Sequence, residues 1–112
     1  MNFNSTIAKL DNSAIQRLLR EIDSMDLALS LKDESPAVSE RFLSNMSSRA
    51  AELIEEHIGL MTEVTKETVK EAQEKILSVV RTLAQTGELS LPPTIEDELQ
   101  YEHEEGKYDG EL

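Results

Sequence analysis

Apolar residues recur at intervals of three and four along most of this chain, and this spacing constrains the fold more than any other feature of the sequence. The longest run holds the spacing for about four helical turns and comprises Val69, Ala72, Ile76, Val79, Val80 and Leu83. A second run comprises Ile15, Leu18, Leu19 and Ile22. Such spacing gathers the apolar side chains on one face of an α-helix, and no segment shows the alternation of a half-buried strand. The sequence therefore predicts an all-α protein, a small right-handed helical domain of about five or six helices.

Helix-capping residues set the limits of the predicted helices. Residues suited to a helix start precede four of them, at Asp11-Asn12-Ser13, Ser35-Pro36, Ser47-Ser48 and Thr65. A further short helix, with Leu27, Leu29 and Leu31, is expected to end near Lys32. Gly87 suits the position after the last helix, where a positive φ costs a glycine little.

The acidic residues concentrate at the C-terminal end. The net charge is -12, and the residues from Thr94 onward carry eight acids and one base. Pro92-Pro93 precedes this stretch, and proline cannot continue a helix. A segment with so many charges cannot bury an apolar face against a core. The sequence therefore predicts a disordered acidic tail over residues 92–112.

Composition and motifs exclude several classes of function. A net charge of -12 opposes binding to nucleic acid or to an anionic membrane. There is no cysteine, His57 and His103 lie on different elements, and the four glycines form no phosphate loop. We therefore expect no catalytic residue, metal site, cofactor or small-molecule substrate, and no enzyme. No basic, apolar leader opens the sequence and no apolar stretch approaches the ~20 residues of a membrane span, which indicates a cytoplasmic protein.

The fourth predicted helix, about residues 49–58, separates its charges from its apolar residues. At 100° per residue, Ala50, Leu53 and Ile54 fall on one side, and Arg49, Glu52, Glu55 and Glu56 fall on the other. Like charges at Glu52 and Glu56, four residues apart, disfavour the helix slightly, and so do acids near its C-terminus. This pattern is typical of a surface that presents charge to a partner, although an acidic protein can also have such a face with no function. His57 is expected to be partly buried and hydrogen-bonded, and Met46 and Met61 to fill the core.

Several longer stretches resemble one family, the flagellar motor switch protein FliG, from the start of its C-terminal torque-generating domain. They are AIQRLLREID over residues 14–23, DLALSLK over 26–32, RFLSNMSSRAAE over 41–52, EAQEKI over 71–76, RTLA over 81–84 and TGEL over 86–89. The family's corresponding signatures include DLALALK and KFLRNMSxRAAE. The resemblance covers about residues 11–90 without gaps. It implies a hinge-like segment over residues 1–10, where Met1-Asn2-Phe3-Asn4 is similar to the family's Met-Phe-x-Phe hinge, and a helical domain over residues 11–91.

The resemblance also implies a partner and a location. In the family, charged side chains on one helix face the cytoplasmic part of the stator protein MotA, and the protein lies at the flagellar basal body on the inner face of the cell membrane. The family's functional charges fall on Lys32, Arg49 and Glu56 of this chain, and Glu52 and Glu55 would set the local field. Other switch proteins, FliM-like or FliG-like, are expected as further partners.

The chain departs from the family at two functional positions. His57 replaces an acid, and Thr62-Glu63-Val64-Thr65 replaces a Gly-Pro-Val-Arg segment, so that a functional arginine is missing. The family's amino-terminal and middle domains are also missing from these 112 residues. These differences leave open an alternative, a diverged regulator or assembly adaptor that binds other switch proteins.

Overall fold

The fold is built from helices alone in the part of the chain that the structure, a computed structural model, describes, which is residues 2–89 and 91. The helices are α1 (Phe3–Lys9), α2 (Asn12–Leu19), α3 (Ser24–Ser30), α4 (Pro36–Leu43), α5 (Ser48–Leu60) and α6 (Lys66–Gln85). The predicted all-α class is confirmed. The predicted acidic tail lies outside the described residues. Among the described helices, none combines the length and the apolar character needed to cross a membrane.

The predicted caps lie at the observed helix starts. Oxygens of the Asp11, Ser47 and Thr65 side chains accept hydrogen bonds from the backbone N–H groups three residues further on, at 2.8, 3.2 and 3.1 Å. Each bond satisfies a donor that the first turn of a helix leaves unpaired. α4 begins differently, with Pro36 at its first position and no side-chain bond from Ser35. These local signals explain why the predicted and observed starts agree.

Helix α1 is not among the helices predicted from the sequence. Asn2 caps it, and Phe3, Ile7 and Leu10 are buried in the core. These three residues have helical spacing, but a helix of seven residues is too short to be stable by itself. Its contacts with α4 and α6 supply the missing stability. The hinge-like segment expected over residues 1–10 therefore contains a packed helix.

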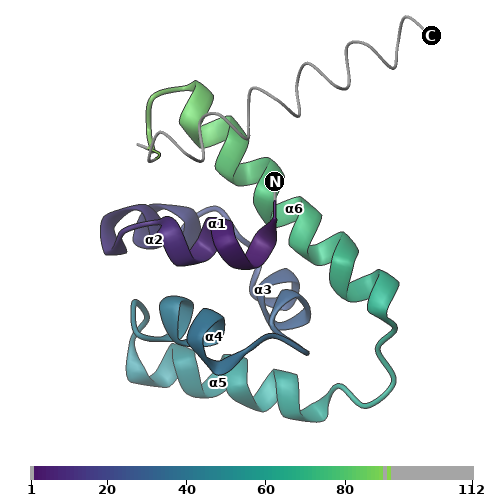
Figure 1. The fold of residues 1–112 in the computed structure, drawn as a ribbon. Coiled ribbons are helices and arrows are strands. Elements are labelled where there is room, and N and C mark those ends of the chain that lie inside the picture. The colour runs from purple at the N-terminus through teal and green to yellow at the C-terminus, as the bar shows by residue number, and fades with distance from the viewer. Residues whose placement is uncertain (1, 90, 92–112) are drawn as a thin grey trace, which may run out of the picture.

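Helix α3 lies at the centre of the molecule, between α5 and α6 (Figure 1). Ala28 is completely buried, and its small side chain allows a close approach of the neighbouring helices. Ser30 is also completely buried, and its hydroxyl donates to the Leu27 carbonyl at 2.7 Å, so the buried polar group is satisfied. The position of α5 is thus set by α3, which also contacts α6.

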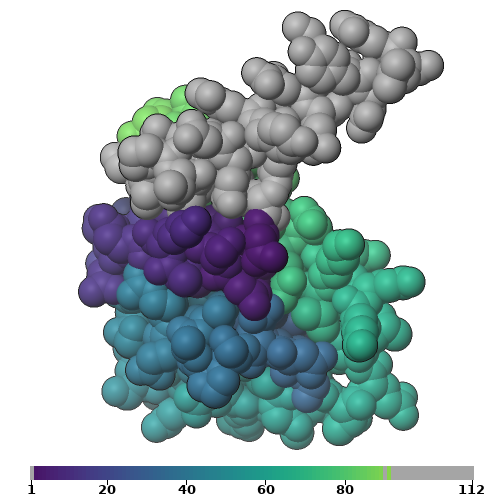
Figure 2. Space-filling view, viewed as in Figure 1, coloured from purple at the N-terminus to yellow at the C-terminus, as the bar shows by residue number. Residues whose placement is uncertain are grey.

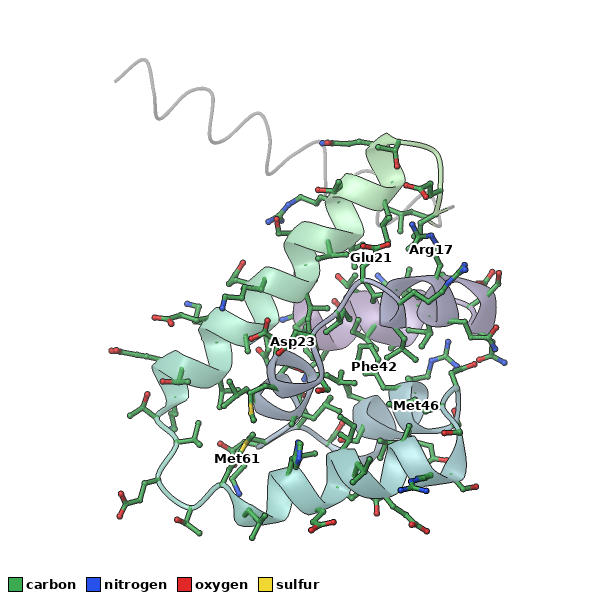
Figure 3. The ribbon with its side chains drawn as sticks, turned by 180° about the vertical axis from the view of Figure 1, so that it is seen from behind. Arg17, Glu21, Asp23, Phe42, Met46 and Met61 are labelled. Atoms are coloured by element: carbon green, nitrogen blue, oxygen red, sulfur yellow. The ribbon has the colours of Figure 1, made fainter. Side chains whose placement is uncertain are left out.

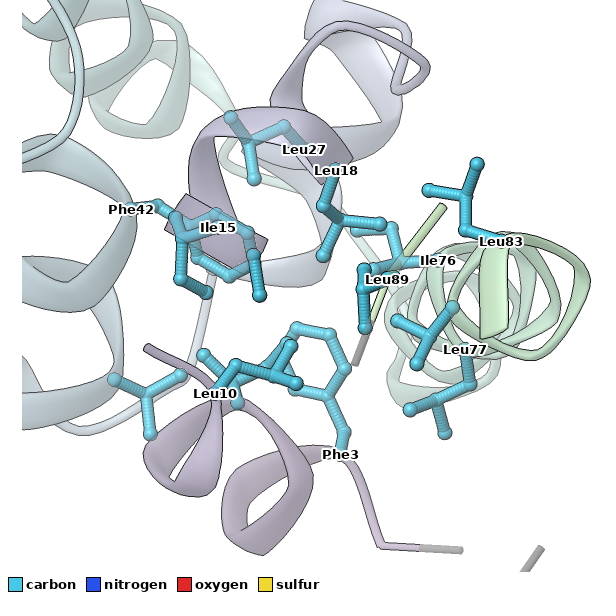
Figure 4. Packing of buried hydrophobic residues seen from close by; sticks show 14 of the residues in the cluster. Phe3, Leu10, Ile15, Leu18, Leu27, Phe42, Ile76, Leu77, Leu83 and Leu89 are labelled. Atoms are coloured by element: carbon cyan, nitrogen blue, oxygen red, sulfur yellow. The ribbon is translucent and has the colours of Figure 1, made fainter. Parts of the chain in front are cut away.

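The core contains one aromatic pair surrounded by aliphatic side chains (Figure 4). The rings of Phe3 from α1 and Phe42 from α4 stack with their centroids 6.4 Å apart. Ile15 and Leu18 of α2 are completely buried in the same cluster. Figure 4 also shows Ile76, Leu77 and Leu83 of α6 in the cluster.

Helix α6 is buried along a wider face than its sequence pattern predicts. The predicted stripe contains Ile76 and Val80, and both are buried. Leu77 is buried as well, although it lies outside that stripe. The reason is that α6 contacts α1 and α2 in addition to α3.

The chain turns back onto the core after α6. Gly87 has a φ of +80°, as predicted for the residue that follows a helix cap. The Gly87 N–H donates to the Ala84 carbonyl at 3.2 Å and the Glu88 N–H to the Leu83 carbonyl at 2.9 Å. This pair of bonds reverses the chain direction, and Leu89 is consequently buried in the core.

A polar network joins α4 to the link between α1 and α2. The Arg41 guanidinium donates to the Leu10 carbonyl, at the end of α1, and to Asn12 Oδ1 at 3.1 Å. Asn45 Nδ2 donates to the Arg41 carbonyl at 2.8 Å, and Gln16 Nε2 donates to Asn45 Oδ1 at 3.1 Å. The Arg41 and Asn45 side chains of the RFLSNMS stretch therefore hold helices together.

A salt bridge, called here the Arg17–Glu88 clamp, joins α2 to the turn after α6. Arg17 donates to Glu21 Oε1 at 2.8 Å (Figure 3) and to Glu88 Oε1 at 2.7 Å. The hydrogen bonds from Arg17 and from the Thr86 hydroxyl lower the pKa of Glu88, and Glu88 in turn raises the pKa of Arg17. The Arg17–Glu88 pair connects residues 71 positions apart in the sequence.

This clamp predicts a pH dependence of stability. The pKa of Glu88 is lower in the folded state than in the unfolded state. The ionised Glu88 side chain therefore stabilises the fold fully above its unfolded-state pKa of about 4.3. This stabilisation is lost as the pH falls through the folded-state pKa. We expect the free energy of unfolding of the wild type to fall more than that of Glu88→Gln between pH 5 and pH 3, measured by urea unfolding. Both residues are partly exposed, so the difference should shrink in 0.5 M salt. Parallel pH profiles for the two proteins would contradict the prediction.

Candidate partner-binding surface

Helix α5 lies at an edge of the molecule with one side against the core. It forms the lower edge in Figure 1 and in the space-filling view (Figure 2). Of its 13 residues, all described, Ile54 is the one buried side chain, at 2% exposure. Ala50, Ala51, His57 and Ile58 are half-buried, and the remaining residues are exposed. Most of the surface of α5 is therefore exposed and available to a partner, and only a small part packs against the core.

The four predicted charges of α5 all lie on its exposed side. Arg49, Glu52, Glu55 and Glu56 are exposed, and none of them forms a salt bridge with another residue of the described chain. Arg17 and Arg41, by contrast, are held in internal contacts. The structure thus brings four of the five predicted site residues together on one helix face.

The sign of these charges is opposite to what the helix itself favours. Arg49 lies in the first turn of α5, where the positive end of the helix dipole disfavours a cation. Glu52 and Glu56 repel each other four residues apart, and Glu55 and Glu56 lie in the C-terminal half. Local helix stability therefore does not account for these residue types at these positions.

The fifth predicted residue, Lys32, lies apart from this face. It follows α3 and is half-buried, and its Nζ donates to the Ile58 carbonyl in the last turn of α5 at 3.3 Å. A cation there satisfies a carbonyl and complements the negative end of the α5 dipole. Lys32 consequently fixes the C-terminal end of α5 to α3.

The prediction for one residue on the charged face is wrong. Leu53 is expected on the apolar side of the helix with Ala50 and Ile54, but the residue is 49% exposed. Leu60, at the end of α5, is 72% exposed. At 100° per residue Leu53 lies about 40° from Arg49 and about 100° from Ile54, so the angles alone leave its burial open.

His57 is half-buried, as predicted, but its hydrogen bonding differs. Its Nδ1 atom is buried and has no hydrogen-bond partner within the described residues. Met46 packs against the core, which agrees with the core-filling role. Met61 is half-buried where the chain leaves α5 (Figure 3).

Thr65, which the resemblance aligns with a functional arginine, caps helix α6 in the structure. Its Oγ1 accepts from the Thr68 N–H at 3.1 Å and so caps α6. Glu63 is exposed in the link between α5 and α6. This link therefore adds a negative charge beside the α5 face and no arginine.

The described residues offer no site for a metal ion, since no three His, Cys, Asp or Glu side chains among them come close enough together. A hollow of about 410 Å³ lies between α1 and α6, away from the α5 charges. Its lining residues are Asn2, Phe3, Asp33, Glu34, Lys66, Val69, Lys70, Gln73, Glu74 and Leu77. This set contains no Ser, Cys or His that could act as a nucleophile–base pair.

Comparison with known proteins gives a family model and several curated relatives that match this chain. A family model described as the FliG C-terminal domain matches residues 2–91. The flagellar motor switch protein FliG of Thermotoga maritima is 45% identical over 83 residues, which are 74% of this chain and 25% of that protein. The Helicobacter pylori protein of the same name is 42% identical over 81 residues, 72% of this chain and 24% of that protein. The chain thus spans about a quarter of the length of these curated relatives.

Solved structures agree with this relationship. A crystal structure of FliG from H. pylori is similar with a TM-score of 0.77 and 39% identity, over 80% of this chain and 42% of that one. The structure of full-length FliG from Aquifex aeolicus gives a TM-score of 0.74 and 30% identity, over 78% of this chain and 27% of that one. The match begins at residue 2, so the family pattern includes α1. The chain belongs to the FliG C-terminal domain family.

Proposed function

We propose that this chain is a rotor component of the flagellar motor switch that works through protein–protein contact and not by catalysis. The observation that carries the proposal is the face of α5, where Arg49, Glu52, Glu55 and Glu56 are exposed and unpaired within the described residues. Their order along α5 opposes local helix stability, which points to a requirement outside the helix.

The partner proposed for this face is the cytoplasmic part of a MotA-like stator protein with complementary charges. Three acids and one arginine give the face a net negative charge, so the stator side should be mostly basic, with an acid opposite Arg49. Exposed ion pairs contribute only about 0–1 kcal/mol each. Contacts of that strength can form and break at every step of rotation, and several together still orient the encounter.

Lys32 has an indirect part in this proposal. Through its bond to the Ile58 carbonyl it holds the C-terminal end of α5, and with it the position of Glu56 relative to the stator. The contact would form at the basal body, on the cytoplasmic side of the membrane, and FliM-like and FliG-like switch proteins would be the neighbours of the domain there.

Reversing two charges on α5 tests the proposal. We expect the double variant Arg49→Glu, Glu56→Lys to bind the cytoplasmic part of the stator protein at least about tenfold more weakly at 50 mM salt, because two attractions become repulsions. The difference should shrink at 0.5 M salt. Both changes suit the helix, since Arg49→Glu puts an acid in the first turn and Glu56→Lys puts a cation four residues after Glu52. Helix content should therefore not fall.

Lys70→Glu is the control for the Arg49→Glu half of this experiment. Lys70 is exposed on α6, and the substitution makes the same charge change as Arg49→Glu on a different helix. It should leave binding unchanged, and cells carrying it should swim normally in soft agar. Cells with the α5 double variant should assemble filaments but swim poorly. Equal stator binding by the wild type and the double variant would overturn the proposal.

The substitutions at His57 and Thr65 favour a second candidate, a regulator or assembly adaptor that binds other switch proteins. Neither residue supplies a fixed charge, and Thr65 instead caps α6. An adaptor that uses its acidic segment should lose its partner when residues 94–112 are removed, whereas a stator-contact domain should tolerate the removal. Loss of filaments in a deletion strain would also favour the adaptor.

A further inference from the structure

Large apolar side chains are exposed at three places in the described chain, and two of them lie on α5. The three are Met25 at 48%, Leu53 at 49% and Leu60 at 72% exposure. A single exposed leucine needs no explanation, but two on the face that carries unpaired charges do.

The two leucines and two of the charges form one continuous stripe along α5. Residues Arg49, Leu53, Glu56 and Leu60 follow one another at intervals of four, three and four. At 100° per residue, all four directions fall within an arc of about 60°. The stripe therefore alternates charged and apolar side chains over most of the helix, and Glu56 lies between the two leucines.

We propose that this stripe, defined by Arg49, Leu53, Glu56 and Leu60, is a mixed apolar and electrostatic docking surface for a basic amphipathic helix of the partner. The proposal rests on the proposed function and specifies the chemistry of its partner. Three acids against one arginine on the α5 face select a basic helix by charge complementarity. Leucines seven residues apart match a helix whose apolar side chains also repeat every seven residues.

The charged and the apolar side chains of the stripe should affect different steps of binding. Charges act over a distance and mainly set the association rate and its salt dependence. Leucines act only at contact, where they displace water, and so mainly slow dissociation. When both leucines are covered, the Glu56 carboxylate loses surrounding water, and its ion pair with a partner cation becomes stronger.

Binding kinetics of leucine variants test whether the apolar side chains mainly slow dissociation. In the full-length chain, Leu60→Ser and Leu53→Ser should each raise the dissociation rate from the stator's cytoplasmic part by about 5- to 10-fold, and change the association rate less than about twofold. Met25→Ser is the matched control, because Met25 is as exposed as Leu53 but lies on α3. It should change neither rate. Leu60 is so exposed that its substitution should leave thermal unfolding unaltered, which keeps the test independent of folding.

The outcomes separate this inference from the proposed function. If charge reversal weakens binding but both leucine variants dissociate at the wild-type rate, the docking surface is purely electrostatic and the inference is wrong. If neither charge nor leucine variants change binding, the proposed function itself fails. A wild-type chain that dimerises in sedimentation equilibrium, and a Leu60→Ser chain that does not, would assign the stripe to self-association and overturn the inference.

Discussion

Phe42→Ala should lower the free energy of unfolding by about 3–5 kcal/mol, which is a large part of the ~5–15 kcal/mol typical of a domain. Phe42 is completely buried and stacks on Phe3 with a centroid separation of 6.4 Å. Its loss leaves a cavity where α4 meets α1, and the described residues hold no further Phe, Tyr or Trp that could fill it. Urea unfolding followed by circular dichroism should show a midpoint lower by about 2 M or more.

Phe42→Leu is the control for the cavity. It keeps an apolar side chain in the site, so we expect it to cost about 1–2 kcal/mol, well below the cost of alanine. The slope of the transition should be the same in all three proteins, because the surface exposed on unfolding is nearly unchanged. An alanine variant that unfolds at the wild-type midpoint would contradict the described core.

Ile54→Ala should release α5 without unfolding the rest of the domain. Ile54 is the one buried side chain of α5, so its truncation removes about 2–4 kcal/mol from a helix otherwise held by the half-buried Ile58 and by the Lys32 bond to the Ile58 carbonyl. α5 contacts α3, while the larger core is formed by other helices. We expect amide hydrogen exchange in α5 to accelerate by roughly 100-fold, with a much smaller change in α6. Stator binding should fall with it, because the charged face is then no longer ordered.

Leu60→Ala is the matched control on the same helix. Leu60 is 72% exposed and should lose less than about 0.5 kcal/mol. Exchange that accelerates equally in α5 and α6 for Ile54→Ala would mean that α5 opens only when the whole domain unfolds, and would contradict the prediction of local release.

Leu53 and Lys32 show where prediction of the candidate site from sequence reached its limit. The exposed positions of Arg49, Glu52, Glu55 and Glu56 follow from helical geometry, because four charges on one side of a helix have to face water. The exposure of Leu53 depends on which flank of α5 the neighbouring α3 covers. The bond from Lys32 to the Ile58 carbonyl joins residues 26 apart, and no local pattern indicates it.

The sequence by itself determined the helical class, five of the six helices, the caps at Asp11, Ser47 and Thr65 and the charged side of α5. Each of these depends on interactions within about one helical turn, such as the Thr65–Thr68 cap, so the sequence pattern carries them directly. The tertiary structure alone decided the existence of α1, the burial of Leu77 and the Arg17–Glu88 clamp. These features depend on which helix faces meet, and that choice is made by packing between segments far apart in the chain.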